Sequence, residues 1–153
     1  MFNHEPAEYD CPFCALVHGF SNDVNALSDI VARSPVALAL IAPRWWPKNH
    51  GHVLVVPLVH HEGLYDLPAE VGHGVHDLTR EMAVALRTSY GCQGVSIRQN
   101  NEPVGHQSVW HYHVHVFPRY TGDGLYSSTP EASYASVDKR EEFAERLRSH
   151  FDG

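Results

Sequence analysis

Long apolar runs, clusters of basic residues and an even set of cysteines are all missing from this sequence. The longest apolar run, VALALIAP, is far too short to cross a bilayer, and the opening MFNHEPAEYD has neither the basic start nor the apolar stretch of a secretory signal. Only three cysteines occur, and an odd number without a signal does not favour a disulfide framework. These absences lead us to expect a cytoplasmic protein with no membrane partner.

Positive charge is also scarce, because 11 Lys and Arg residues are set against 18 Asp and Glu residues, for a net charge of −7 with neutral histidines. The basic residues form no run. This balance argues against a nucleic acid or an anionic membrane as the partner, whereas a small anionic substrate stays open if its site is locally positive. With 43% hydrophobic residues, the 153 residues suit a single domain with a real core.

Apolar periodicity and turn residues predict a mixture of strands and helices. Apolar residues recur at helical spacing between Pro68 and Gly91, which suit the first turn and the C-cap of a long helix. We expect helices at 12–19, 68–90 and 137–151, strands at 29–34, 35–42, 52–57, 94–99 and 107–117, and irregular segments at 44–51, 100–106 and 121–133. The order favours an α+β fold, in which an antiparallel meander sheet carries the long helix and the C-terminal helix.

The stretch HYHVHVFPRY, residues 111–120, places three histidines at alternate positions. On a strand that stops at Pro118, His111, His113 and His115 share one face and the intervening residues face the core. The first and third histidines are then roughly 13 Å apart at about 3.3 Å per residue, which makes it difficult for all three to bind one metal ion. The spacing therefore favours a division of labour among them.

Two interpretations of this histidine row compete. The first is a solvated sheet face that happens to be rich in histidine. The second, which we favour, is nucleophilic catalysis, because neutral imidazole is a good nucleophile and its unperturbed pKa is about 6.5. His113, the middle ring, is best placed to attack, and a neighbouring ring can bind an anion or deliver a proton. Upstream, Gln107 and Ser108 lie where a loop with exposed amides enters the strand, which suits phosphate oxygens.

Together these residues resemble the histidine triad (HIT) family of nucleotide hydrolases and transferases. HYHVHVF fits the family signature His-φ-His-φ-His-φ-φ, where φ is apolar. Further matching positions over about residues 9–120 are Gly51-His52 before VLVVP, His60, Asn100, Gln107-Ser108 and Pro118-Arg119. The resemblance implies a HIT-like antiparallel sheet with helices on one face, often paired into a homodimer, with residues 121–153 as a C-terminal extension that ends in a helix.

The resemblance also implies roles for individual residues. His113 corresponds to the histidine that attacks the α-phosphorus of a nucleotide, and His115 to the third histidine, which contacts phosphate. The supporting positions near the phosphate and the leaving group are His52, Asn100, Gln107 and Ser108. Arg44 stands where many relatives carry an Asp or Asn that contacts the ribose, so the ribose contact is unassigned. Trp45 and Trp46, next to it, are candidates either for stacking on a base or for an interface.

The pair Cys11 and Cys14, in CPFC, has three interpretations. A redox dithiol requires an apolar strand before the motif, and HEPAEYD is no such strand. Two unliganded buried cysteines are the second interpretation. We favour the third, a zinc site completed by two histidines. The resemblance implies that these are His60, which has His61 as a neighbour, and His111.

Three functions stay open at this point. The leading one is a phosphohydrolase that acts at the α-phosphate of a nucleotide adduct, of the phosphoramidate or dinucleoside polyphosphate type, through a nucleotidyl-histidine. A nucleotidyltransferase is the second. In the transferase branch of this family the triad resembles HxHxQ, so His115 at the third position here favours hydrolysis. The third is a zinc-stabilised nucleotide-binding module without turnover. The expected cofactor is one structural zinc ion, and no organic cofactor is expected.

Overall fold

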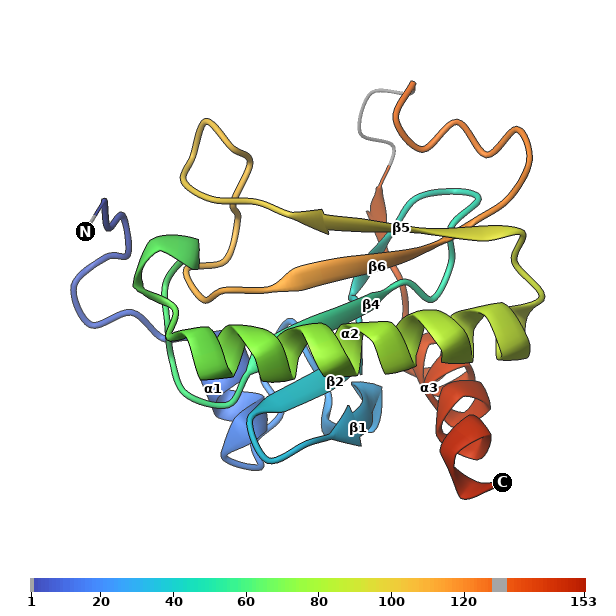
Figure 1. Ribbon diagram of the computed structural model, residues 1–153, viewed down its shortest axis with the longest axis horizontal. Helices are drawn as coiled ribbons and strands as arrows, with labels where there is room; N and C mark the ends of the chain where they lie inside the picture. The colour runs from blue at the N-terminus through green and yellow to red at the C-terminus, as the bar shows by residue number, and fades with distance from the viewer. Residues whose placement is uncertain (1, 128–131) are drawn as a thin grey trace.

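The computed structural model describes residues 2–127 and 132–153, and its centre is a five-stranded antiparallel sheet with the order β1-β2-β4-β6-β5 (Figure 1). The strands are β1 Ile30–Arg33, β2 Ala37–Ile41, β4 Val53–Pro57, β5 Gly94–Gln99 and β6 Val114–Arg119. The helices are α1 Pro12–Val17, α2 Ala69–Tyr90 and α3 Val137–Asp152. A separate two-stranded ribbon pairs β3 Arg44–Trp45 with β7 Ser133–Tyr134, and short 3-10 turns cover Leu27–Asp29 and Leu64–Asp66.

The α+β class is confirmed, but the sheet is not a simple meander. Strands β1, β2 and β4 follow one another as hairpin neighbours, whereas β5 lies at the edge and β6 returns between β4 and β5. The 22-residue helix α2 connects β4 to β5 across the sheet, as Figure 1 shows. A helical crossover does not force its two strands to be neighbours, and here the place between β4 and β5 is taken by β6, which carries the histidine sequence.

Alternation along β2 and β4 explains why both strands are buried throughout. Ala37, Ala39 and Ile41 belong to the core beneath α2, while Leu38 and Leu40 face a second core that α1 covers. The resemblance implied helices on one face only, and that expectation is incomplete, because α1 packs on the face opposite α2 and α3. Strands buried on both faces read as continuous apolar runs, as these two do.

The two long helices are fixed by their ends and by one buried ion pair. Helix α2 follows Pro68 and ends at Gly91, whose φ of 66° is left-handed and suits a glycine C-cap. Helix α3 is joined to the segment before β1 by Arg140, which makes two bonds of 2.7 and 3.1 Å to the carboxylate of Asp29. Both side chains are almost fully buried, so removing one partner would leave the other charge uncompensated.

Several boundaries differ from the sequence-based expectation, most of them by one or two residues. Strand β6 begins at Val114, because the backbone before it is bonded to the loop after β4, with the amide of Tyr112 donating to the carbonyl of His61. Strand β6 also continues through Pro118, which pairs with Val95 of β5 but not with β4, so on the β4 side the missing N–H has no strand to meet. The segment 44–51, expected as a loop, begins with β3.

The expected irregular segment at 121–133 falls partly on residues 128–131, which lie outside the described residues. None of the helices in the described ranges is long and apolar enough to span a membrane.

Candidate active site and metal centre

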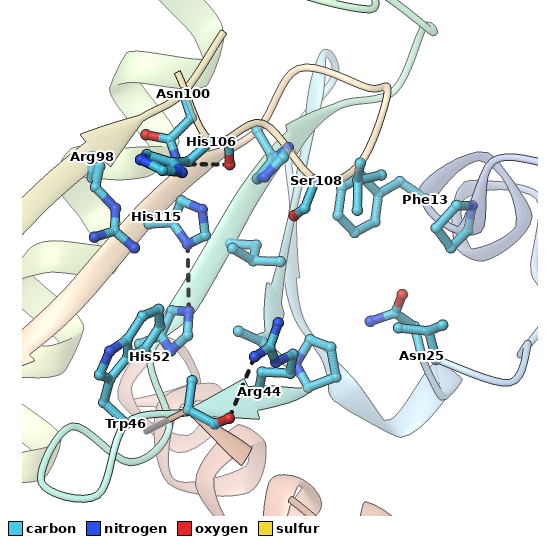
Figure 2. Close-up of a pocket in the computed structure, with 18 of the residues that line it drawn as sticks. Phe13, Asn25, Arg44, Trp46, His52, Arg98, Asn100, His106, Ser108 and His115 are labelled. Atoms are coloured by element: carbon cyan, nitrogen blue, oxygen red, sulfur yellow. Dashed lines mark hydrogen bonds between the residues drawn. The ribbon is translucent and has the colours of Figure 1, made fainter. Parts of the chain in front are cut away.

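A pocket of about 770 Å³ opens on the sheet face opposite α2 (Figure 2). Its volume is in the range of small-molecule sites. Among the predicted site residues, the lining includes His113 and His115 from the histidine segment, His52 just before β4, Asn100 just after β5, and Ser108. The fold therefore gathers five of the six predicted substrate-site residues around one space.

His113 is 3% exposed, and its ring is held by a bond of 2.7 Å from Nδ1 to the carbonyl of His111. A carbonyl only accepts, so Nδ1 carries the proton and Nε2 keeps its lone pair. Burial lowers the pKa of His113, which favours the neutral ring. Because His113 lines the pocket, this tautomer offers an unprotonated nitrogen on the face where a ligand would bind.

His115 and His52 form the next part of the row, with Nδ1 of His115 3.4 Å from Nε2 of His52. Burial, followed by the charge of Arg98 and by His113, lowers the pKa of His52 to about 3. Burial and the neighbouring His113, His52 and Arg98 also hold the pKa of His115 well below its usual value. Both rings are therefore neutral at ordinary pH.

Arg98 is a pocket residue that the sequence interpretation missed. It lies on β5 directly opposite His115 in the strand register, and its guanidinium stacks over the rings of Trp46 and Phe117. A signal was available, because Arg98 is the one basic residue in the strand predicted at 94–99. Choosing it required the knowledge that this strand pairs with the histidine strand.

The opposite wall is formed by the N-terminal half of the chain and by the β3–β7 ribbon. Figure 2 shows the Asn25 amide and the Arg44 guanidinium pointing inward from this side. Asn25 is 1% exposed, and neither atom of its amide has a hydrogen-bond partner among the described residues. Trp46 lines the pocket, whereas Trp45 is buried in the main core and donates to the carbonyl of Ala42 at 2.7 Å.

Gln107 is the one of the six predicted substrate-site residues that does not line this pocket. Its amide nitrogen donates to the carbonyl of Glu62 at 2.6 Å, and its amide oxygen accepts from the backbone of Glu102 at 2.9 Å. The side chain thus braces the loop that carries Ser108. That loop is tight at Gly105, where a Cβ would lie 2.0 Å from the carbonyl oxygen of Asn101.

The metal ligands predicted from CPFC lie together at the other end of the histidine segment. The ligand atoms of Cys11, Cys14, His60 and His111 are all within 4.8 Å of one another. Individual separations are 3.3 Å from Cys11 Sγ to His111 Nδ1 and 3.4 Å from Cys14 Sγ to His60 Nδ1. A tetrahedral zinc ion requires sulfur and nitrogen ligands about 3.5 Å apart, so the four atoms fit such an ion.

Both histidines of this cluster have the ring orientation that a metal ligand needs. The far nitrogen of His111, Nε2, donates to the carbonyl of Pro57 at 2.9 Å, and Nε2 of His60 lies 2.7 Å from the carboxylate of Glu5. Each bond leaves Nδ1 to face the two sulfur atoms. Such an outer hydrogen bond on the far ring nitrogen is typical of metal-bound histidine.

The redox interpretation of Cys11 and Cys14 is disfavoured by their surroundings. Cys11 is 6% exposed, and burial together with Cys11 raises the pKa of the Cys14 thiol to about 12. A redox dithiol requires an accessible thiol with a lowered pKa. A divalent cation inverts this situation, because it favours both thiolates at once.

The fold and the two clusters define an α+β protein with a histidine-lined pocket beside a closed site with two cysteine and two histidine ligands. The model of the HIT domain family matches residues 25–122, and the chain belongs to this family.

Similar proteins agree with this assignment. A HIT-like protein of Methanocaldococcus jannaschii is 30% identical over 130 residues, covering 84% of this chain and 94% of the relative. The structure of a zinc-bound histidine triad family protein from Mycobacterium smegmatis has a TM-score of 0.74 and 30% identity, covering 94% of each chain. A HIT-like protein from Bartonella henselae reaches a TM-score of 0.77 at 25% identity, covering 92% of this chain and 95% of the other.

Two relatives bear the names of enzymes. An adenosine 5′-monophosphoramidase of Schizosaccharomyces pombe is 28% identical over 109 residues, which are 71% of this chain and 74% of the relative. An adenylylsulfatase of Arabidopsis thaliana is 26% identical over 119 residues, which are 78% of this chain and 57% of the relative. Some members of the family are therefore nucleotide hydrolases.

Proposed function

We propose that the protein hydrolyses a nucleotide adduct at its α-phosphate and that His113 is the nucleophile. The observation that carries this proposal is the bond from His113 Nδ1 to the carbonyl of His111, which leaves Nε2 unprotonated in a ring that lines the pocket. The two relatives named as a monophosphoramidase and an adenylylsulfatase support the same class of reaction.

The proposed reaction has two displacements at phosphorus. Nε2 of His113 attacks, the bond from phosphorus to the leaving group breaks, and the leaving group departs with a proton taken from solvent. The carbonyl of His111 keeps accepting the Nδ1 proton, which stabilises the positive charge that develops on the ring. Water then attacks the same phosphorus and releases a proton to solvent, the bond from phosphorus to Nε2 breaks, and the nucleoside monophosphate leaves with the ring neutral again.

The other pocket residues hold the phosphoryl group in this proposal. His115 and His52 are neutral rings beside the nucleophile, and Ser108 and Asn100 offer a hydroxyl and an amide from the loop side. Gln107 acts through that loop by bracing it. The main energetic help comes from positioning and from donors aimed at the phosphoryl oxygens.

We also propose that Cys11, Cys14, His60 and His111 hold a structural zinc ion. Four protein ligands leave no open position for a substrate or a catalytic water, so this ion would tie the N-terminal segment to the sheet. The zinc-bound relative from Mycobacterium smegmatis supports the choice of metal.

A turnover assay with a fluorogenic adenosine phosphoramidate tests the proposed function. Wild-type protein should release AMP with net retention of configuration at phosphorus, because two in-line displacements each invert it. A single inversion would exclude the covalent intermediate. An absence of turnover combined with AMP binding would favour a binding module instead. That residues 1–153 form one domain, that the protein is a cytoplasmic homodimer, and that it binds no nucleic acid are predictions that the assay leaves open.

A further inference from the structure

Arg98 occupies a defined place in the histidine row. The strand register pairs its Cα with that of His115, so the two side chains leave the sheet from the same face. The guanidinium lies 4.9 Å from the ring centroid of Phe117 and 5.3 Å from that of Trp46. Since Phe117 follows His115 on the same face, the cation lies one side chain beyond His115, on the side away from His113.

The charge of Arg98 has no counterpart in the described part of the chain. No described residue forms an ion pair with its guanidinium or accepts a hydrogen bond from it, and its Nε is buried without a partner. The described residues that line the pocket include two arginines and no Asp or Glu, although the whole chain carries a net charge of −7. A half-buried cation without an anion is costly unless a ligand supplies one.

The aromatic rings fix the guanidinium before any ligand arrives. A cation packed against two rings loses little further freedom when it binds, and a planar guanidinium matches phosphate or sulfate oxygens in pairs. The lowered pKa values of His52 and His115 are consistent with an uncompensated charge at this point.

We infer that Arg98 binds a second anionic group of the substrate, attached to the reacting phosphoryl group and distinct from it. The inference rests on the proposed function, because it takes His113 as the point of attack. An anion at Arg98 is separated from that point by the ring of His115, so it belongs to a neighbouring substituent. The site therefore selects adducts that carry a further phosphate or sulfate over adducts that carry an uncharged group there.

The second anion has two chemical sources, the leaving group and the ribose. For the leaving group, kcat/KM is measured with adenosine 5′-phosphosulfate and with adenosine 5′-phosphoramidate. Arg98→Met should lower kcat/KM for the phosphosulfate by on the order of tenfold to a hundredfold, and that for the phosphoramidate by less than about threefold. Arg80→Met, which removes a charge from an exposed position on α2 away from the pocket, should change neither value.

For the ribose, calorimetry compares adenosine 3′,5′-bisphosphate with AMP. If the anion is a ribose phosphate, wild-type protein should bind the bisphosphate about tenfold tighter or better, and Arg98→Met should abolish that difference. Arg98→Gln repeats both measurements with a polar, uncharged side chain, and Arg98→Lys should keep part of the selectivity because it keeps the charge.

The inference is overturned if Arg98→Met affects charged and uncharged ligands equally in both arms while its melting temperature stays near that of wild type. If wild-type protein turns over no adduct, the proposed function fails, but calorimetry with ADP, AMP and the bisphosphate still decides whether Arg98 holds a second anion. If Arg98→Met shows no melting transition, and so does not fold, the same comparison of charged and uncharged ligands is made with Arg98→Gln and Arg98→Lys.

Discussion

His111 and His113 are two residues apart and have opposite proton positions. His111 donates from Nε2 to the carbonyl of Pro57 and turns Nδ1 toward the two sulfur atoms. His113 donates from Nδ1 to the carbonyl of His111 and leaves Nε2 free. In each ring a backbone carbonyl selects the tautomer, and thereby selects which nitrogen is available to a metal or to a substrate. Identical side chains thus acquire different chemistry from the carbonyl that each one meets.

Phe13 separates these two regions. Its ring packs edge-on against His111 at 5.6 Å and against His113 at 5.5 Å, both measured between ring centroids. Helix α1 places it there, between Cys11 and Cys14 in the chain. One apolar ring therefore stands between the closed cluster and the open pocket, and the comparison predicts that the two can be disrupted separately.

The largest effect should come from His113→Ala. This change should lower turnover by roughly 10⁴-fold or more, because it removes the proposed nucleophile, while zinc content and melting temperature stay close to wild type. AMP binding, measured by calorimetry, should change only a few-fold. Turnover near the wild-type rate would contradict the proposed mechanism.

The reverse experiment is the double change Cys11→Ser with Cys14→Ser. It should remove the zinc and lower the melting temperature by about 10 °C or more, because the unfolded chain does not bind the ion in the same way. The fraction that stays folded should still turn over substrate. Metal analysis and calorimetry check both points, and Cys92→Ser, which changes the cysteine outside the cluster, should keep its zinc. Zinc that survives the double change would mean that other residues bind it.

The pH dependence of stability should reveal the buried neutral rings of the pocket. An unfolded histidine takes up a proton near pH 6.5, whereas folded His52 does so only near its pKa of about 3. As the pH falls below about 6.5, the unfolded state binds the extra proton and becomes favoured, by at most about 1.4 kcal/mol per pH unit for each such ring.

Above about pH 6.5 the ring of His52 is neutral in both the folded and the unfolded state, so it adds no pH dependence to the free energy of unfolding. Urea unfolding from pH 7.5 to pH 5 should give a smaller slope for His52→Gln than for wild type. Since both proteins retain the four zinc ligands, loss of metal in acid affects them alike. Equal slopes would mean that His52 is protonated in the folded state.

The smallest effect should come from the outer hydrogen bond of the metal cluster. Glu5→Gln weakens the acceptor for Nε2 of His60, so zinc affinity should fall by on the order of tenfold. Competition with a chelator measures it. The exposed neighbour Glu8, changed to Gln, is the matched control and should leave affinity unchanged.

Much of this arrangement was predictable because it depends on local patterns. Apolar periodicity predicted α2 and α3 within a few residues, and the predicted strand 94–99 coincides with β5. The residues of CPFC and the alternating histidines were found by spacing. Patterns of this kind involve residues that are close together in the sequence, so local sequence suffices to detect them.

The rest depended on pairing between distant segments. Arg98 becomes a pocket residue only through its register opposite His115, and Gln107 is diverted from the pocket by carbonyl and amide groups of a loop more than forty residues upstream and of Glu102. Asn25 reaches the pocket from a segment with no apolar periodicity at all. Apart from the bond between Gln107 and Glu102, such contacts join segments that are distant in the sequence, and they are set by tertiary packing.

Gly51, which precedes His52, packs against α3, the last helix of the domain to be synthesised. Its φ is 72°, and a Cβ there would lie 2.3 Å from the ring of Phe143 on α3. The ribosome completes β4 and the histidine strand before α3 and β7 exist, so Gly51 has the hydroxyl of Tyr90 as a partner, at 2.9 Å from its carbonyl, before Phe143 has been made. Arg44 on the pocket wall likewise has no strand partner until Tyr134 of β7 has been made. A nascent chain therefore holds His113 well before it holds the pocket wall that β7 completes, and the described lining is assembled only when Tyr134 has been made.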